Sequence, residues 1–253
     1  MAGLIGGNRK TGKGRSVKDA IKAILFDKDG TLLDFAATFA PAYRQAADLA
    51  TRGDPELARH LLTGTGMDIE TEMAAAGSLL AAGNSEEIAA AWIALGADGP
   101  RDTLSAELDH IFTQAMHAAT ALPGVPAAVK ALRDMGYTLG VASSDSEAAI
   151  RAFLSGKSLT DTFSFVCGYD SGHGPKPEPG MLLAFARDIG LPPSRIAMIG
   201  DNTHDLEMAR AAGAGLAIGV LSGTSNRDDL AVLADDVLQD AAELVSYFAE
   251  SPA

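Results

Sequence analysis

The sequence is poor in cysteine, in positive charge and in long apolar runs, and each shortage excludes a class of protein. Its single cysteine, Cys167, rules out an intrachain disulfide and fits a reducing compartment, so we expect a cytoplasmic protein. No apolar run approaches the roughly 20 residues that span a bilayer, so we expect no membrane insertion. Lysine and arginine number 20 against 33 acidic residues, and the formal net charge of -13 argues against a general nucleic-acid binder.

What remains is the composition of an ordinary globular protein. Hydrophobic residues make up 47% and charged residues 21% of the 253 residues, enough for one large domain or a domain with an insertion. An acidic chain can still bind a small anion, because a local positive site can lie in a protein of negative net charge. Residues 1–17 carry four basic side chains among glycines, and the apolar run that follows is short and contains a lysine. We therefore expect a flexible basic arm there and no signal peptide.

The most distinctive pattern lies near the N-terminus. A largely apolar run over residues 21–26 predicts a buried strand, and it stops abruptly at Asp27, Asp29 and Gly30. Two carboxylates so close together raise the free energy unless a cation or a function holds them there. Aspartate and glycine also form ordinary polar turns, so this motif alone leaves both interpretations open.

Between residues 35 and 120 the character of the chain changes. The segment is rich in alanine, leucine, methionine and glutamate, and Phe39, Tyr43 and Ala50 fall on one helical face. Asp54 before a proline and Ser85 before two glutamates mark helix starts. We expect helices around residues 39–50, and at 55–62, 68–76, 85–95 and 103–117. The segment is predicted to be an all-helical insertion after the first strand.

Strands and helices alternate in the rest of the chain. Strands are expected at residues 137–142, 163–167, 196–199, 216–220 and 237–238, and helices at 126–135, 146–154, 180–189, 206–212 and 241–248. This alternation predicts a mostly parallel sheet that helices cover on both faces.

The polar residues that follow these strands are expected to meet. In parallel sheets of this kind, ligands bind beyond the carboxyl ends of the strands. Those ends carry Asp27 and Asp29, then Ser143 and Ser144, then the loop to Lys176, and last Asp201 and Asp205. The sequence therefore predicts one crevice at that edge of the sheet.

The charges in such a crevice point to a metal ion and a phosphate. Several carboxylates with a single lysine would repel one another and any anionic substrate, and a divalent cation removes this repulsion. An oxygen-rich set of ligands suits Mg²⁺. Phosphoryl transfer needs mainly alignment and charge neutralisation. One carboxylate can act as the nucleophile, and a second can protonate the leaving oxygen and later activate water.

Four motifs together resemble those of the haloacid dehalogenase-like (HAD) hydrolase superfamily, in the family's order. They are Phe26-Asp27-Lys28-Asp29-Gly30-Thr31-Leu32, Val141-Ala142-Ser143-Ser144, Lys176-Pro177-x-Pro179 and Gly200-Asp201-x-x-x-Asp205. The likeness covers residues 21–34 and about 122–240, and the helical segment lies where the family inserts a C1-type cap. It implies an α/β fold with a Rossmann-like parallel sheet core (residues 18–34 and 122–253) and an inserted all-α cap domain (residues 35–121).

The resemblance implies a role for each residue that matches a motif. Asp27 is the nucleophile and a magnesium ligand. Asp29 is the general acid and base, and its backbone carbonyl binds magnesium. Ser143 binds the phosphate through its hydroxyl. Lys176 neutralises the phosphate and steadies Asp27, and Asp201 is the acidic magnesium ligand.

Other motif residues support these or depart from the pattern. Asp205 is expected near the metal as a supporting or alternate ligand, with a plain helix-start carboxylate as the rival interpretation. Thr31 is expected to orient Asp29, and Gly30 lets the loop turn tightly. Ser144 takes a phosphate-binding place where many relatives have asparagine. Lys28 occupies a variable place between the two acids, and we assign it no catalytic role.

The function that the resemblance implies is a Mg²⁺-dependent phosphatase that acts on a small phosphorylated metabolite, as a monomer or a homodimer. The nearest subgroup is phosphoglycolate phosphatase-like. A phosphosugar mutase and a non-catalytic binding protein are the alternatives. A haloalkanoate dehalogenase is disfavoured because it needs no acid at Asp29, and a phosphonate hydrolase because residues 35–120 contain no lysine. The cap is expected to swing on the links near Asp34 and 122–124.

Overall fold

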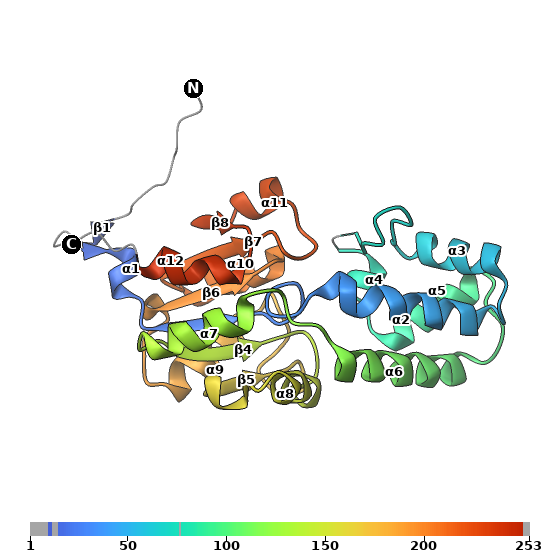
Figure 1. The fold of residues 1–253 in the computed structure, drawn as a ribbon, viewed down its shortest axis with the longest axis horizontal. Coiled ribbons are helices and arrows are strands. Elements are labelled where there is room, and N and C mark those ends of the chain that lie inside the picture. The colour runs from blue at the N-terminus through green and yellow to red at the C-terminus, as the bar shows by residue number, and fades with distance from the viewer. Residues whose placement is uncertain (1–9, 12–14, 76, 250–253) are drawn as a thin grey trace, which may run out of the picture. The chain divides into compact units, whose positions relative to one another are not determined.

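A computed structural model of the chain describes residues 10–11, 15–75 and 77–249 (Figure 1). They form two compact units. One contains the chain up to Leu33 and again from Ala121, and the other covers Asp34–Thr120. Of the expected basic arm, residues 1–9 and 12–14 lie outside the described residues. The described parts of that arm are two short antiparallel strands and the start of a helix: β1 (Lys10–Thr11), β2 (Arg15–Ser16) and α1 (Val17–Ala20).

The first unit is built on a six-stranded parallel sheet. Its strand order is β5-β4-β3-β6-β7-β8, and every neighbouring pair is parallel. The strands are β3 (Ala23–Phe26), β4 (Thr138–Ala142), β5 (Phe165–Cys167), β6 (Ile196–Gly200), β7 (Leu216–Val220) and β8 (Asp236–Leu238). The predicted parallel α/β sheet is thus confirmed, and each expected strand lies within two residues of its predicted bounds.

Helices alternate with these strands, as the sequence pattern predicted. They are α7 (Val125–Asp134), α8 (Glu147–Gly156), α9 (Gly180–Asp188), α10 (Thr203–Ala212), α11 (Arg227–Ala231) and α12 (Leu244–Ala249), with 3-10 turns η1 (Thr160–Thr162), η2 (Pro193–Arg195) and η3 (Ala241–Glu243). Helix α9 packs against α10, and α7 packs against α12. No helix in the described part of the chain is long and apolar enough to cross a membrane.

The central strand β3 shows how the core of this unit is covered. Its four residues, Ala23–Phe26, are fully buried. Successive side chains of a strand point to opposite faces, so burial of all four means that both faces of the sheet are covered. On one of these faces, Ala23 and Leu25 pack with apolar residues of α9 and α10. The strand that precedes the two acids is therefore held firmly on both sides.

The second unit is helical and has its own core. Its helices are α2 (Phe35–Ala50), α3 (Pro55–Gly64), α4 (Leu79–Ala82), α5 (Ser85–Ala94) and α6 (Arg101–Ala118). Helix α2 packs against α3 and α6, and α5 packs against α6. Trp92 is fully buried in this core, and its indole N–H donates a hydrogen bond to Thr65 Oγ1 at 3.1 Å. The predicted all-helical segment is confirmed in kind.

One helix predicted in this unit is wrong. Residues 68–75 form no helix: residues 69–71 make a turn, and Ala74 pairs with Met67 in an isolated antiparallel bridge. Residue 76 lies outside the described residues. The Asp68 carboxylate accepts hydrogen bonds from the backbone N–H groups of Glu70 and Thr71, a local turn that competes with helix formation. Glu72 has a left-handed φ of 58°, which interrupts a right-handed helix. The helix forms later, as α4.

Candidate functional site

The loops that follow β3, β4, β5, β6 and β7 meet at the carboxyl edge of the sheet, because all of these strands run in the same direction. Asp27 is the first residue after β3. Its backbone N–H donates to the carbonyl of Ile199 in β6 at 2.8 Å, so the sheet itself fixes its position. Its side chain is buried, with an exposed fraction of 9%.

Lys176 reaches this carboxylate from the loop after β5. Its Nζ lies 2.5 Å from Asp27 Oδ1 and 2.6 Å from Asp205 Oδ1. The lysine side chain is buried, so both ion pairs are largely shielded from water. Burial alone would lower the pKa of Lys176, but the carboxylates of Asp205 and Asp27 outweigh burial and raise it. Lys176 therefore carries its charge between two acids that are far apart in the sequence.

Asp201 is the first residue after β6, and Asp205 lies in the first turn of α10. Carboxylate oxygens of Asp27, Asp201 and Asp205 lie within 4.8 Å of one another, and all three residues are buried. Asp205 also belongs to the cap of α10, where its Oδ2 accepts the backbone N–H of Asn202 at 3.2 Å. Asp205 is therefore a helix-start carboxylate that also pairs with Lys176. Its role as a supporting or alternate metal ligand stays a prediction.

This cluster holds more negative charge than its lysine offsets. The pKa of Asp27 is raised to about 6. Burial is the largest cause, the charge of Lys176 opposes it, and the charge of Asp205 adds to it. Burial also raises the pKa of Asp201 well above its usual range, and the charges of Asp27 and Asp205 add to that effect. Buried carboxyl groups so close together, with raised pKa values, mark a place for a cation. The donor set, three carboxylates in a buried cluster, suits a hard divalent ion.

The loop after β7 also contacts the cluster, and the sequence analysis did not predict that it would. The Asp201 Oδ2 atom accepts the backbone N–H of Thr224 at 2.8 Å and its hydroxyl at 3.3 Å. The Ser222 hydroxyl donates to the Gly30 carbonyl at 2.6 Å. Gly30 has a φ of +75°, and a Cβ there would lie 2.7 Å from the Asp201 carboxylate. Only glycine lets the first loop and Asp201 approach so closely.

Asp29 lies in a different environment from Asp27. Its Oδ1 accepts a hydrogen bond from Lys28 Nζ at 2.8 Å, and its Oδ2 accepts one from Ser143 Oγ at 3.4 Å. Burial raises the pKa of Asp29, Lys28 lowers it, and Asp27 and Asp145 raise it again. The carboxylate therefore has a partner on each oxygen, and neither partner is the lysine expected to serve the phosphate.

Three predictions around Asp29 meet different outcomes. Thr31 does not make the predicted contact, since its buried hydroxyl has no hydrogen-bond partner within the described residues, and Lys28 and Ser143 hold Asp29 instead. Ser143 is buried at the end of β4, where its hydroxyl also accepts the N–H of Asp145 at 3.1 Å. Ser144 is exposed. The assignment of both serines to phosphate binding stays a prediction.

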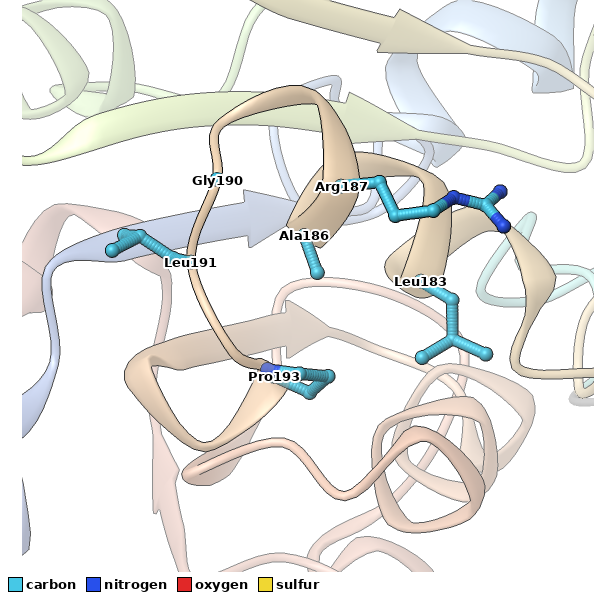
Figure 2. A pocket seen from close by; sticks show the side chains of 6 residues that line it. All are labelled: Leu183, Ala186, Arg187, Gly190, Leu191 and Pro193. Carbon is cyan, nitrogen blue, oxygen red and sulfur yellow. The ribbon is translucent and has the colours of Figure 1, made fainter.

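A pocket of about 440 Å³ lies away from these residues (Figure 2). It opens between the end of α9 and the turn that leads into β6, whereas Asp201 follows the other end of β6. Its lining residues are Leu183, Ala186, Arg187, Gly190, Leu191 and Pro193. Because it contains neither a carboxylate nor a lysine, it cannot supply the chemistry that the cluster offers.

Comparison with known proteins places this geometry in a family. The family model described as haloacid dehalogenase-like hydrolase matches residues 21–213. A protein of Dickeya dadantii named "Probable phosphatase IndB" is 34% identical, over 86% of this chain and 88% of its own length. A phosphoglycolate phosphatase of Rhodospirillum rubrum is 30% identical, over 88% of this chain and 89% of its own length.

The fold has solved counterparts as well. The crystal structure of a "predicted phosphoglycolate phosphatase" from Haemophilus somnus superimposes with a TM-score of 0.70 at 21% identity, and covers 90% of this chain and 98% of its own. At that identity the likeness concerns the fold alone. The family model and the relatives at 30% identity and above span both the sheet and the helical unit. With its four motifs meeting at one edge of the sheet, the chain belongs to the haloacid dehalogenase-like hydrolases.

Proposed function

We propose that the protein is a Mg²⁺-dependent phosphatase that hydrolyses a small phosphorylated metabolite through a phosphate ester on Asp27. The observation that carries this proposal is the contact between Lys176 and both Asp27 and Asp205, beside the carboxylate of Asp201. It combines a buried nucleophile, a fixed ammonium and a cluster of acids at one edge of the sheet. Relatives named phosphatases at 30% and 34% identity support the reaction class.

The residues present fit a magnesium ion. Asp27 and Asp201 each use one oxygen for a protein partner, Lys176 in one case and Thr224 in the other. The Asp27 carboxylate also accepts the backbone N–H of Lys28. Because a carboxylate oxygen can accept more than one bond, oxygens of both residues are still available for a ligand. These oxygens, with Asp205 nearby and the backbone carbonyl of Asp29 as implied by the family, would hold the ion. Bound Mg²⁺ would supply positive charge for the phosphate oxygens and lower the pKa of the acids that bind it.

The reaction then follows from the chain's own side chains. A carboxylate oxygen of Asp27 attacks phosphorus, and the bond from phosphorus to the ester oxygen breaks while Asp29 donates a proton to that oxygen. Asp29, now ionised, takes a proton from a water molecule whose oxygen attacks the same phosphorus. The bond between phosphorus and Asp27 breaks, and inorganic phosphate leaves. Lys176 holds Asp27 in place and offsets the charge that collects on the phosphate.

For the substrate, we propose a small phosphate ester with phosphoglycolate as the first candidate. The support for this candidate is that the Rhodospirillum rubrum relative is named a phosphoglycolate phosphatase. The helical unit, Asp34–Thr120, is proposed to act as the cap that selects the substrate and excludes water. That unit contains no lysine, so a Schiff base with a phosphonate substrate is disfavoured.

The experiment is a phosphate-release assay on purified protein with a panel of phosphorylated metabolites that includes 2-phosphoglycolate. Activity should disappear in EDTA and return with Mg²⁺. Asp27→Asn should lower kcat at least about 10³-fold while leaving the circular dichroism spectrum unchanged, because amide nitrogen and oxygen are poor nucleophiles. Asp188→Asn, at an exposed aspartate on α9, is the matched control and should keep full activity.

Two results would contradict the proposal. Substantial turnover by Asp27→Asn would show that Asp27 is not the nucleophile. Activity that survives EDTA would show that the reaction needs no metal. A phosphosugar mutase uses the same pair of acids, and it would convert a sugar phosphate into its isomer without releasing phosphate in equal amount. Chromatography of the products therefore separates the two reactions.

A further inference from the structure

Lys28 is a fully buried lysine between the two acids of the first loop. Its ammonium lies 2.8 Å from Asp29 Oδ1 and 3.1 Å from Asp145 Oδ2. Asp145 is 117 residues away along the chain, in the loop that follows β4. One side chain therefore joins the two loops in which the candidate acid and the candidate phosphate-binding serine lie.

The contacts around this lysine fix the direction of the Asp29 carboxylate. Lys28 holds one carboxylate oxygen and Ser143 Oγ the other, at 2.8 and 3.4 Å. Asp145 is itself anchored, since its Oδ1 accepts the backbone N–H of Ser146 at 2.7 Å, at the start of α8. Ser143 accepts the backbone N–H of Asp145 at 3.1 Å. The network closes on itself, so Asp29 cannot rotate without breaking two bonds.

A charge at this place requires an explanation. Taking an ammonium out of water is unfavourable unless partners with good geometry compensate. An apolar side chain would fill the same space without that penalty. It would, however, leave the carboxylates of Asp29 and Asp145 facing each other without a positive charge between them, and both are partly exposed, at 27% and 31%. Repulsion would then turn Asp29 toward solvent.

We propose that Lys28 is a positioning residue for the hydrolysis of esters with poor leaving groups. Anchored on Asp145, it holds the carboxyl group of Asp29 where that group can give its proton to the leaving oxygen. This inference rests on the proposed function, in which Asp29 is the general acid. An alkoxide must be protonated as its bond to phosphorus breaks, whereas 4-nitrophenolate leaves without a proton. Loss of the lysine therefore affects the two kinds of ester unequally.

The test compares an alkyl phosphate that the wild type hydrolyses with 4-nitrophenyl phosphate. Lys28→Met, which keeps the length of the side chain and removes its charge, should lower kcat on the alkyl ester about 10²-fold and on the aryl ester less than about tenfold. KM should change little, because Lys28 acts through Asp29 and not on the substrate. Lys22→Met, at an exposed lysine just before β3, is the control and should change neither rate.

Two further variants test the same role of Lys28 if Lys28→Met does not fold. Lys28→Arg keeps the charge and should restore part of the lost rate on the alkyl ester, with the ratio of the two esters moving back toward the wild type. Asp145→Asn lies at a partly exposed position and leaves the pair between Lys28 and Asp29 intact. It should show the same preference for the aryl ester with a smaller loss.

Asp29→Asn provides the reference that separates this proposal from the proposed function. If Asp29→Asn loses the alkyl ester selectively while Lys28→Met and Asp145→Asn lose both esters equally or neither, the role of Lys28 is overturned and the phosphatase mechanism stands. If Asp29→Asn itself treats both esters alike, Asp29 is not the general acid. The role given to Lys28 then fails with it.

Discussion

The two sides of the Asp27–Asp29 loop are built on the same plan and differ in their access to water. On each side a buried lysine bridges an acid of the first loop and an acid from elsewhere in the chain: Lys176 between Asp27 and Asp205, and Lys28 between Asp29 and Asp145. The carboxylates on the Lys176 side are exposed by 9% and 2%, and those on the Lys28 side by 27% and 31%. The two sides can therefore do different chemistry.

The low solvent exposure of the carboxylates on the Asp27 side suits a nucleophile beside a metal. Three acids share one ammonium there, and with little water to screen them the excess negative charge attracts a cation. Partial exposure on the Asp29 side suits proton exchange, because a general acid must recover its proton from solvent or a reactant in each cycle. We expect the division of labour between two neighbouring aspartates to follow from this difference in solvation.

Removing Lys176, the lysine between the two more buried carboxylates, should have the largest effect on stability. Lys176→Met leaves two buried carboxylates unpaired, so in EDTA it should lower the free energy of unfolding by about 3–5 kcal/mol. Lys28→Met should lower it by less, because water reaches both of its partners. Urea denaturation followed by circular dichroism measures both. Equal destabilisation by the two variants would contradict the difference in solvation, and Lys22→Met serves as the control for loss of a lysine.

The pH dependence of stability tests the burial of Asp27, the acid on the Lys176 side. The pKa of Asp27 is raised from 3.8 to about 6, so between these values the folded protein holds a proton that the unfolded chain has released. The free energy of unfolding of the metal-free protein should therefore fall as the pH rises through this window. Asp27→Asn cannot ionise, and at about pH 7.5 in EDTA it should be more stable than the wild type by up to about 3 kcal/mol.

This advantage should shrink toward zero near pH 4, where the wild-type Asp27 is protonated as well. Thermal denaturation of both proteins at several pH values gives the comparison. Adding Mg²⁺ should stabilise the wild type more than Asp27→Asn, because the metal binds the ionised carboxylate. A stability difference that does not change with pH would mean that burial does not hold a proton on Asp27.

The sheet could be predicted from the sequence because its signals are local. Most of the strands are short, largely apolar runs that end at a polar residue or a glycine, as at Phe26 before Asp27 and Gly200 before Asp201. The helical unit gave a weaker signal. Residues 68–75 have a helix-forming composition, but the turn at Asp68 and the left-handed Glu72 prevent the helix. Composition reports an average over a segment, and a single side-chain contact can override it.

The site divides in the same way. Asp27, Lys176, Asp201 and Asp205 could be predicted to meet, because parallel strands bring their following loops to one edge. Lys28 could not be placed, since its contact with Asp145 depends on side-chain packing between two loops. The sequence showed only that Lys28 directly follows a buried strand and the first acid, which does not indicate the partner of its ammonium. Thr224 gave none, as it lies in a polar loop without a charged residue of its own.

The smallest expected effect concerns the hydroxyl groups that support each side. Thr224→Val removes a hydroxyl 3.3 Å from Asp201 and keeps the shape of the side chain, while the shorter backbone hydrogen bond at 2.8 Å remains. A long hydrogen bond to a carboxylate contributes about 1 kcal/mol, so kcat should fall about fivefold and the Mg²⁺ concentration for half activity should rise to a similar extent. Ser143→Ala, on the Asp29 side, should change the alkyl-to-aryl ratio and not the Mg²⁺ requirement. If Ser143→Ala shifts the requirement for Mg²⁺ as much as Thr224→Val does, the two sides are not separate, because a hydroxyl that contacts Asp29 and the backbone of Asp145 would then govern the metal.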